Sequence, residues 1–420
     1  MAAALADPDP DVVVVRFDRR RRAFRELSCF ERQQLLESPN IASVEIGKDG
    51  FTAGARRVFR IIREYPAISR DTDRHFADLL TQNRRRGFAY AGTKFLFRAY
   101  RTYRKLLAQP RVVWSAVKTK RIDPETGIVL LSNPIVLGKF LPRVLHVTRK
   151  CAFICHDLIP ILRPEFAIDS DHAQRFSRNI VRAIRAKTDI LCTSKTSMAM
   201  LVGNLDALEG TRVHRFPMPS ILHEKAKAAG RTDRLGAAEP FVLYCSTIEA
   251  RKNHLLLAKV WQRAADEGVS LPKLVCVGKW GWGANELIDY LAAHPALSSR
   301  IIFAGPVGDL ELVDYYRGAL FGVVPSRMEG WGYGASECLD FGIPVIVSTA
   351  PALRESTRGI MPAIDPDDTA GWYAEIRRMS EDSAYRCALS RRIAEVHAPT
   401  PTAASWNGIK HALVGSTSPA

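Results

Sequence analysis

Two carboxylates flank a glycine-rich segment in the C-terminal half of the chain. The segment reads Met-Glu-Gly-Trp-Gly-Tyr-Gly-Ala-Ser-Glu over residues 328–337, with Glu329 and Glu337 on either side of three glycines. Glycine allows a backbone to approach a ligand closely and to adopt positive φ. The segment stands between a strand pattern and a helix pattern, and the start of a helix attracts phosphate. The pattern therefore favours a loop that binds phosphate and sugar hydroxyls; a glycine-rich turn with two solvated glutamates is the alternative.

Two cations follow an earlier strand-like run. Arg251 and Lys252 lie in the segment Ser-Thr-Ile-Glu-Ala-Arg-Lys-Asn-His (246–254), after the apolar residues 241–245. Basic side chains are disfavoured at the N-terminal end of a helix. A cationic pair at the expected start of a helix therefore predicts an anionic ligand such as a diphosphate; a solvated basic first turn is the alternative.

A histidine and an aspartate end a third apolar run, Cys-Ala-Phe-Ile-Cys-His-Asp at 151–157. We predict a strand here, with His156 at its carboxyl end, where ligands bind to parallel sheets. The alternative is that Asp157 caps the next segment and that His156 has only a structural role.

The residues from 241 onward show the clearer organisation. Short apolar runs alternate with segments of helical periodicity, which predicts a parallel sheet covered on both faces. Such sheets bind ligands at the carboxyl ends of their strands, where the strand order reverses. We expect strands at 241–245, 273–278, 300–305, 321–325 and 344–348.

The first half of the chain predicts a second, less regular α/β domain. A small and polar stretch at 224–240 suggests a linker between the two domains. A short amphipathic helix that contains Trp406 is expected at 402–415. Further strands are expected at 11–17, 111–117, 127–132, 151–157 and 189–194, with a helix at 170–187.

The positive charge is concentrated at one end of the chain. The 420 residues carry a net charge of +16, of which +15 belongs to residues 1–150 and +1 to the remainder. This asymmetry suggests an anionic partner: a nucleic acid, an anionic lipid surface or a phosphate-bearing acceptor. The sequence contains no run of 18 apolar residues, so we predict no transmembrane helix. The first residues do not resemble a secretory signal. The eight cysteines form no CxxC pair.

The three motifs, in the order HDLIP, STIEARKNH and EGWGYGASE, resemble the retaining glycosyltransferases of the GT-B fold known as glycosyltransferases group 1. They are most similar to bacterial members that act in exopolysaccharide or lipopolysaccharide assembly. The resemblance covers about residues 125–410. It implies two Rossmann-like domains that face each other across a cleft: an acceptor-binding domain (1–225) and a donor-binding domain (226–395). A C-terminal helix (396–420) is expected to return to the first domain.

The resemblance also assigns roles to the motifs. Glu329 would contact hydroxyls of the donor sugar, Glu337 would bind the ribose, and His156 would touch the transferring sugar. Arg251 and Lys252 would neutralise the diphosphate leaving group, in place of a metal ion. The other donor-binding positions are Thr247, Gly330 and the backbone amides of Trp331, Gly332 and Tyr333.

Two positions depart from the family pattern. Gly334 stands where the family usually has proline, and Thr247 stands where many members have arginine. The second departure places more of the phosphate neutralisation on Arg251 and Lys252.

By resemblance we expect hexose transfer, with mannose as the leading candidate, from GDP-mannose or a UDP-sugar, without a permanently bound cofactor. The expected acceptor is a saccharide or a polyprenyl-diphosphate-linked sugar. The expected location is cytoplasmic, with peripheral attachment to an anionic inner-membrane surface. A basic nucleic-acid-binding or membrane-binding protein without transferase activity is the main alternative, although no nucleic-acid-binding module is recognisable. A sugar phosphorylase, an epimerase and a non-catalytic relative are further alternatives.

Overall fold

A computed structural model of the chain divides into two units, Met1–Ile122 and Asp123–Ala420. In the first unit it describes one antiparallel hairpin, β1 (Val15–Asp18) and β2 (Ala23–Glu26). The strand expected at 11–17 is therefore present in part, but it pairs with a hairpin partner. The strand expected at 111–117 lies outside the described residues. The structure describes residues 15–18, 23–26, 128–130, 141, 151–168, 170–204, 211–231 and 239–414.

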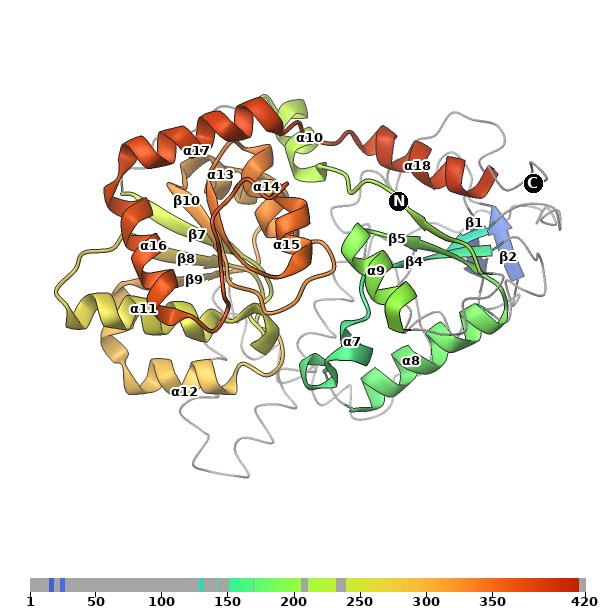
Figure 1. The fold of residues 1–420 in the computed structure, drawn as a ribbon, viewed down its shortest axis with the longest axis horizontal. Helices are drawn as coiled ribbons and strands as arrows, with labels where there is room; N and C mark the ends of the chain where they lie inside the picture. Colours follow the sequence, from blue (N-terminus) through green and yellow to red (C-terminus); the bar gives the residue numbers. More distant parts are fainter. Residues whose placement is uncertain are drawn as a thin grey trace, which may run out of the picture. The chain divides into compact units, whose positions relative to one another are not determined.

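The second unit contains two parallel sheets, and the first has the order β3-β4-β5-β6 (Figure 1). Its most regular strands, β4 and β5, are buried throughout. Helix α8 lies between these two strands in the sequence. Its buried residues include Phe176 and Ile180. The elements of this part are β3 (Ile128–Leu130), β4 (Cys151–Cys155), α7 (Ile159–Leu162), α8 (Ser170–Arg185), β5 (Asp189–Cys192), α9 (Lys195–Asn204) and β6 (Val213–Arg215).

The C-terminal helix α18 (Thr402–Val414) covers one face of the first sheet (Figure 1). Its residues Ile409 and Ala412 share a buried cluster with Ile154 of β4 and Leu191 of β5. Trp406 packs against the same cluster. Helix α18 thus packs against β4 and β5, which lie more than 200 residues earlier in the sequence.

The second sheet has six parallel strands in the order β12-β11-β10-β7-β8-β9. All five strands expected in this half are present within a residue or so of the expected bounds. A strand that is covered on both faces of a parallel sheet appears in the sequence as a continuous apolar run. Their bounds are β7 (Phe241–Cys245), β8 (Lys273–Val277), β9 (Ile301–Gly305), β10 (Phe321–Val324) and β11 (Val345–Ser348); β12 (Ala363–Ile364) was not expected.

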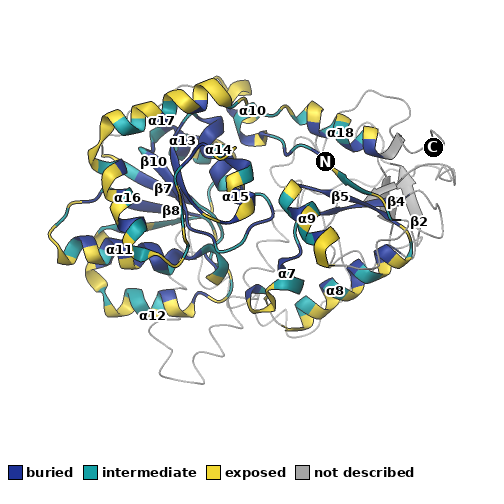
Figure 2. Cartoon of the chain, in the orientation of Figure 1, coloured by how far each residue is buried: buried dark blue, intermediate teal, exposed yellow. Residues whose placement is uncertain are grey.

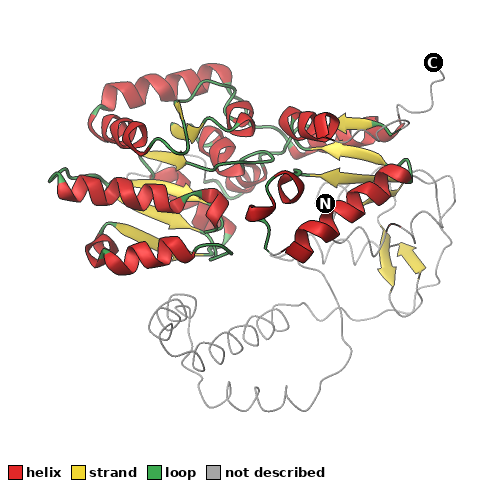
Figure 3. Ribbon diagram, turned by 60° about the horizontal axis from the view of Figure 1, so that its bottom comes forward, coloured by secondary structure: helices red, strands yellow, loops and turns green. Residues whose placement is uncertain are grey.

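Helices cover both faces of this second sheet, and their outer surfaces are exposed while the strands between them are buried (Figures 2 and 3). Helix α11 (His254–Asp266) contacts α12 (Asn285–Ala293) and α16 (Thr369–Glu381). A separate group is formed by α10 (Ile221–Ala228), α13 (Asp309–Gly318), α14 (Tyr333–Asp340) and α15 (Pro351–Ser356). Helix α17 (Ser383–Val396) follows α16. The expected α/β class, with parallel sheets, is confirmed.

The linker expected at 224–240 is wrong in its first part. Residues 221–228 form α10, and its Leu222 and Ala226 are buried in the core of the second sheet. Their i, i+4 spacing places both on one helix face, and this apolar stripe outweighs the polar composition of the segment.

The chain passes between the two sheets at two neighbouring points. The backbone groups of Ser220, on the outward pass, exchange a hydrogen bond with Thr400, on the return pass (Ser220 N to Thr400 O, 2.9 Å). The Ser220 hydroxyl donates to Asp340 Oδ1 (2.8 Å), and His397 Nε2 lies 2.8 Å from the same oxygen. These contacts fix both passes to the C-terminal end of α14.

Candidate functional site

The predicted site residues of the second sheet follow the two strands between which the strand order reverses. From β7 the chain proceeds through β8 to β9 on one side, whereas from β10 it proceeds through β11 to β12 on the other. The segment with Arg251 and Lys252 follows β7, and the glycine-rich loop follows β10. The carboxyl ends of these neighbouring strands form the switch point at which open α/β sheets bind ligands.

Arg251 and Lys252 both bind Glu329 at this switch point. Arg251 Nη1 lies 2.8 Å from Glu329 Oε2, and Lys252 Nζ lies 2.5 Å from Glu329 Oε1. Arg251 Nη1 also donates to the Met328 carbonyl (2.6 Å), and its Nη2 donates to Glu249 Oε1 (2.7 Å). Three residues from two separate motifs, which were predicted to act on one ligand, are thus joined directly.

The cluster is largely withdrawn from solvent. The Glu329 side chain is 7% exposed, and those of Arg251 and Lys252 are 16% and 15% exposed. Burial alone would raise the pKa of Glu329, but the positive charges of Lys252 and Arg251 outweigh it and lower the pKa to about 2. Glu329 is therefore ionised at neutral pH and available to accept hydrogen bonds.

The local backbone differs from the expected helix start. Arg251 and Lys252 lie in a 3-10 turn (Ala250–Lys252), and Asn253, with a left-handed φ of 58°, separates this turn from α11. The turn directs both cations toward the loop after β10. Their charge is balanced by Glu249 and Glu329. The sequence analysis considered only solvent or an anionic ligand as partners for the two cations.

The end of β4 touches the glycine-rich loop. A Cβ at Gly330 would lie 2.2 Å from the His156 carbonyl oxygen and 3.0 Å from Asp157 Cβ, so only glycine fits without movement. His156 is an exposed residue, and Asp157 Oδ1 accepts from Ile159 N (2.9 Å). The structure therefore brings the HDLIP motif to the loop through its backbone, and the sugar contact of the His156 side chain stays a prediction.

The remaining predicted donor residues lie around the same loop. Gly332 has a φ of 94° and precedes α14, while Tyr333 is its first residue and is exposed. The indole of Trp331 packs against the cluster beneath α18, and its Nε1 donates to Ser336 Oγ (3.2 Å). Thr247 contacts a different loop, because a Cβ at Gly281 would lie 2.7 Å from Thr247 Cγ2.

A comparison with known families assigns this region. Residues 239–382 match the family described as Glycosyl transferases group 1. The chain contains a glycosyl transferases group 1 domain. That domain includes the whole second sheet and every predicted site residue except His156.

Curated relatives of the chain include sugar transferases of bacteria. The serotype-specific mannosyltransferase WbdA of Escherichia coli is 26% identical over 217 residues, which are 48% of this chain and 26% of WbdA. The O-antigen chain mannosyltransferase B of Escherichia coli is 29% identical over 160 residues, 38% of this chain and 42% of that protein. The chain thus spans about a quarter of WbdA and under half of the second relative.

Solved structures with a similar arrangement include sucrose-phosphate synthase from Thermosynechococcus elongatus and Anabaena HepE in complex with UDP and glucose. The first has a TM-score of 0.49 and 21% identity, covering 64% of this chain and 68% of the synthase. The second has a TM-score of 0.48 and 15% identity, covering 63% of this chain and 71% of HepE.

Glu337 of the group 1 domain receives a hydrogen bond from a residue that the sequence analysis missed. Tyr316, which is fully buried in α13, donates its hydroxyl hydrogen to Glu337 Oε2 (2.7 Å). Burial raises the pKa of Glu337 to about 7, although the bond from Tyr316 acts in the opposite direction. The charge of this carboxylate therefore changes near neutral pH.

We expect Glu337→Gln to stabilise the group 1 domain and to weaken nucleotide binding. A carboxyl whose pKa is raised on folding favours the folded state at low pH, and that stability is lost as pH rises from about 4.5 to about 7. Glutamine keeps an acceptor for Tyr316 without the charge, so Tm should rise by a few degrees at pH 8 and less at pH 5. Differential scanning fluorimetry at both pH values measures this, with the exposed Glu395→Gln as the control.

The family resemblance assigns ribose binding to Glu337. On that assignment the same variant should lose affinity for nucleoside diphosphates, because glutamine accepts fewer hydrogen bonds from ribose hydroxyls than a carboxylate does. Isothermal titration calorimetry measures the change, which should be larger at pH 8 than at pH 6. An unchanged affinity together with a raised Tm would assign Glu337 no contact with the ligand.

Other residues of the site also escaped the sequence analysis. Glu249 stands within a motif that was recognised, so its carboxylate was a visible signal. Ser194 and Ser197 follow β5 (Asp189–Cys192), which is shorter than the strand predicted at 189–194, and both contact Gly330. Tyr316 had no signal, because nothing in a helix pattern indicates which residue contacts the next helix.

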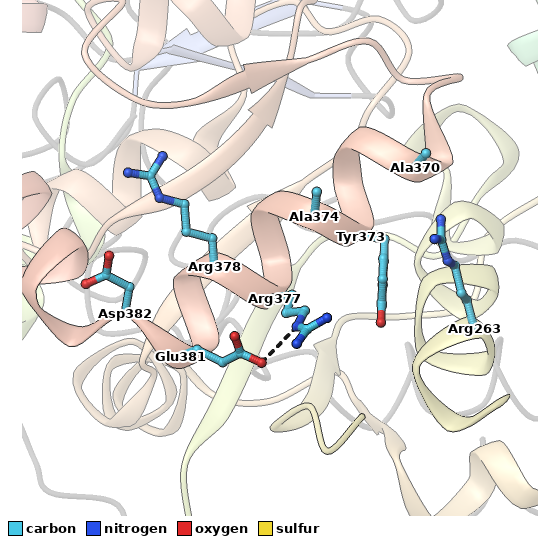
Figure 4. A pocket seen from close by; sticks show the side chains of 8 residues that line it. All are labelled: Arg263, Ala370, Tyr373, Ala374, Arg377, Arg378, Glu381 and Asp382. Atoms are coloured by element: carbon cyan, nitrogen blue, oxygen red, sulfur yellow. Dashed lines mark hydrogen bonds and ion pairs between the residues drawn. The ribbon is translucent and has the colours of Figure 1, made fainter. Parts of the chain in front are cut away.

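A groove of about 460 Å³ lies elsewhere, over α11 and α16 (Figure 4). Its arginines already have acidic or aromatic partners: Arg263 binds Glu267, and Arg377 binds Glu381. It contains none of the predicted site residues, so we do not assign it to the site. Within the described ranges, no three His, Cys, Asp or Glu side chains are placed to share a metal ion.

Proposed function

We propose that the chain is a retaining glycosyltransferase that moves a hexose from a nucleotide-diphosphate sugar to a saccharide or polyprenyl-diphosphate-linked acceptor. The observation that carries the proposal is the buried cluster of Glu329, Arg251 and Lys252 at the switch point of a group 1 domain. Mannose is the leading sugar, and cell-surface polysaccharide synthesis the leading process, because two relatives are named as serotype-specific and O-antigen mannosyltransferases.

The proposed chemistry follows from the charges of this cluster. When the bond between the anomeric carbon and the diphosphate breaks, its electron pair remains on the diphosphate oxygen. Arg251 and Lys252 stabilise that negative charge in a site of low dielectric. The acceptor hydroxyl oxygen bonds to the anomeric carbon on the same face, and its proton passes to the departing diphosphate. Glu329 accepts hydrogen bonds from the sugar, and the diphosphate shares the cations that Glu329 binds in the free protein.

A donor screen tests this proposal. We expect one of the UDP- or GDP-sugars to raise Tm by several degrees at saturating concentration and to be slowly hydrolysed. Because two cations take the place of a divalent ion, EDTA should leave the hydrolysis unchanged. If no nucleotide sugar protects the protein, the transferase proposal fails. Loss of hydrolysis in EDTA, with recovery in Mn²⁺ or Mg²⁺, would show that a metal supplies the charge.

We also propose that the basic N-terminal region binds an anionic membrane surface. The net charge of +15 in residues 1–150 supports this, and most of these residues lie outside the described part. No helix among the described residues has the length and apolarity to cross a bilayer. A basic residue near an anionic surface contributes on the order of 1 kcal/mol, so a few suffice for reversible binding.

We expect the chain to co-sediment with vesicles that contain an anionic phospholipid and to dissociate as salt rises, because counterions screen the charges. Vesicles of neutral phosphatidylcholine serve as the control and should retain little protein. Equal binding to both kinds of vesicle at low salt would contradict electrostatic docking.

A further inference from the structure

Two buried serines of the first sheet's domain contact the glycine-rich loop of the group 1 domain. The hydroxyl of Ser194 lies 2.6 Å from the Gly330 carbonyl oxygen, and that of Ser197 lies 3.0 Å from it. Ser197 Oγ lies closer, at 2.6 Å, to the His156 carbonyl oxygen. Both serines are fully buried.

The distances assign the protons. Each hydroxyl carries a single hydrogen, and the two contacts of 2.6 Å are the shortest. The two hydroxyl oxygens also lie 2.8 Å from each other. Because the carbonyl contacts are shorter, we assign the hydrogen of Ser194 to Gly330 and that of Ser197 to His156. The backbone N–H of Ser197 in turn donates to Ser194 Oγ (2.8 Å), which fixes the orientation of the first hydroxyl. The result is a closed set of bonds that joins the end of β4, the start of α9 and the loop.

A planar trans peptide transmits this contact to the next residue. The carbonyl of Gly330 and the N–H of Trp331 belong to one peptide group and point in opposite directions. When Ser194 holds the carbonyl, the Trp331 N–H is directed to the other side of the loop. That N–H is one of the amides predicted to bind the donor.

The serines are themselves held in place from the group 1 domain. Glu355 of α15 accepts hydrogen bonds from the backbone N–H groups of Lys195 (2.7 Å) and Thr196 (2.9 Å) at the start of α9. A carboxylate at a helix N-terminus is favoured by the helix dipole. The indole of Trp331 is anchored separately, in the cluster beneath α18.

We propose that Ser194 and Ser197 are positioning residues that orient the peptide between Gly330 and Trp331, so that its N–H faces the donor diphosphate or sugar. The inference rests on the proposed function. The serines do not touch the substrate. They act through the peptide, and they do so only when α9 lies against the loop.

The test is the double variant Ser194→Ala/Ser197→Ala. We expect kcat for donor hydrolysis to fall about ten- to a hundredfold, somewhat less than the loss of a direct oxyanion donor. Affinity for the matching nucleoside monophosphate, measured by calorimetry, should stay within about twofold, because ribose binding is assigned to Glu337 and not to the oriented peptide. Ser380→Ala is the control, since its hydroxyl bonds only the Ile376 carbonyl of its own helix among the contacts described (2.7 Å).

The outcomes separate this inference from the proposed function. If the wild-type chain neither binds nor hydrolyses any nucleotide sugar, the proposed function fails. If the wild type is active and the double variant keeps its kcat, or loses monophosphate affinity in proportion to kcat, the positioning role is wrong. Should the double variant not fold, Ser194→Ala, which leaves Ser197 to bind His156, is measured in its place and should lose about tenfold in kcat by the same reasoning.

Discussion

We expect Lys252→Ala to lower kcat/KM for the nucleotide-sugar donor by about two to three orders of magnitude, the range seen when a charge-stabilising donor is removed. Lys252 is largely buried, and its ammonium group lies 2.5 Å from Glu329. In such surroundings water cannot replace the lost charge on the departing diphosphate. The variant also leaves Glu329 with Arg251 as its remaining cationic partner in the cluster, so the pKa of Glu329 rises from about 2.

A steady-state assay of donor hydrolysis, together with circular dichroism, measures this effect. Lys273→Ala is the matched control. Lys273 is the first residue of β8, and its ammonium group binds the exposed Glu239 (2.7 Å). The control should keep wild-type activity. A folded Lys252→Ala variant with less than a tenfold loss would show that Arg251 alone supplies the charge.

Gly330→Ala is expected to lower kcat/KM at least a hundredfold, because a misplacement of about 1 Å in a site can have that effect. The added Cβ would lie 2.2 Å from the His156 carbonyl oxygen, which is backbone and has no flexible end that could move aside. The loop must therefore withdraw from the end of β4 and from the serines. Overpacking of this kind also lowers the stability by about 1–3 kcal/mol, which should appear as a reduced Tm.

Gly308→Ala provides the control for this second variant. Gly308 precedes α13, and a Cβ there would have no atom within 4 Å. Its φ of −75° suits alanine, so its activity and Tm should match the wild type. If Gly330→Ala retained full activity, close contact between β4 and the loop would not be needed for catalysis.

The second sheet was predictable because each of its strands is a continuous apolar run bounded by polar residues. The same patterns located the two loops at its switch point, although Arg251 and Lys252 lie in a 3-10 turn before the helix and not at its start. Single residues that close the cluster were harder to find. Tyr316 of α13 donates to Glu337 of α14. The sequence pattern of neither helix indicates that the two helices are neighbours.

Failures of the sequence analysis have a common physical origin. The polar composition of α10 predicts a linker, because only Leu222 and Ala226 indicate the buried face of this helix. The contact between Gly330 and His156 joins residues 174 positions apart, and sequence patterns carry no information on such distances. The role of Ser194 likewise depends on which carbonyl lies opposite its hydroxyl.

The bond between Ser220 and Thr400 holds the two ends of the segment between them side by side. This arrangement favours exchange of that segment between related proteins. The segment between them enters and leaves its host domain at one place, so its two ends are already joined in space. Domains with adjacent termini tolerate insertion into other proteins. Residues 221–399 therefore enter and leave at one point, but exchanging them for the corresponding part of a relative also requires matching the contacts of Gly330 with His156 and Ser194 and the bond of Glu355 with Lys195. Under the proposed assignment of donor binding to the group 1 domain, a chimaera made at this point is expected to take its nucleotide preference from the donated residues.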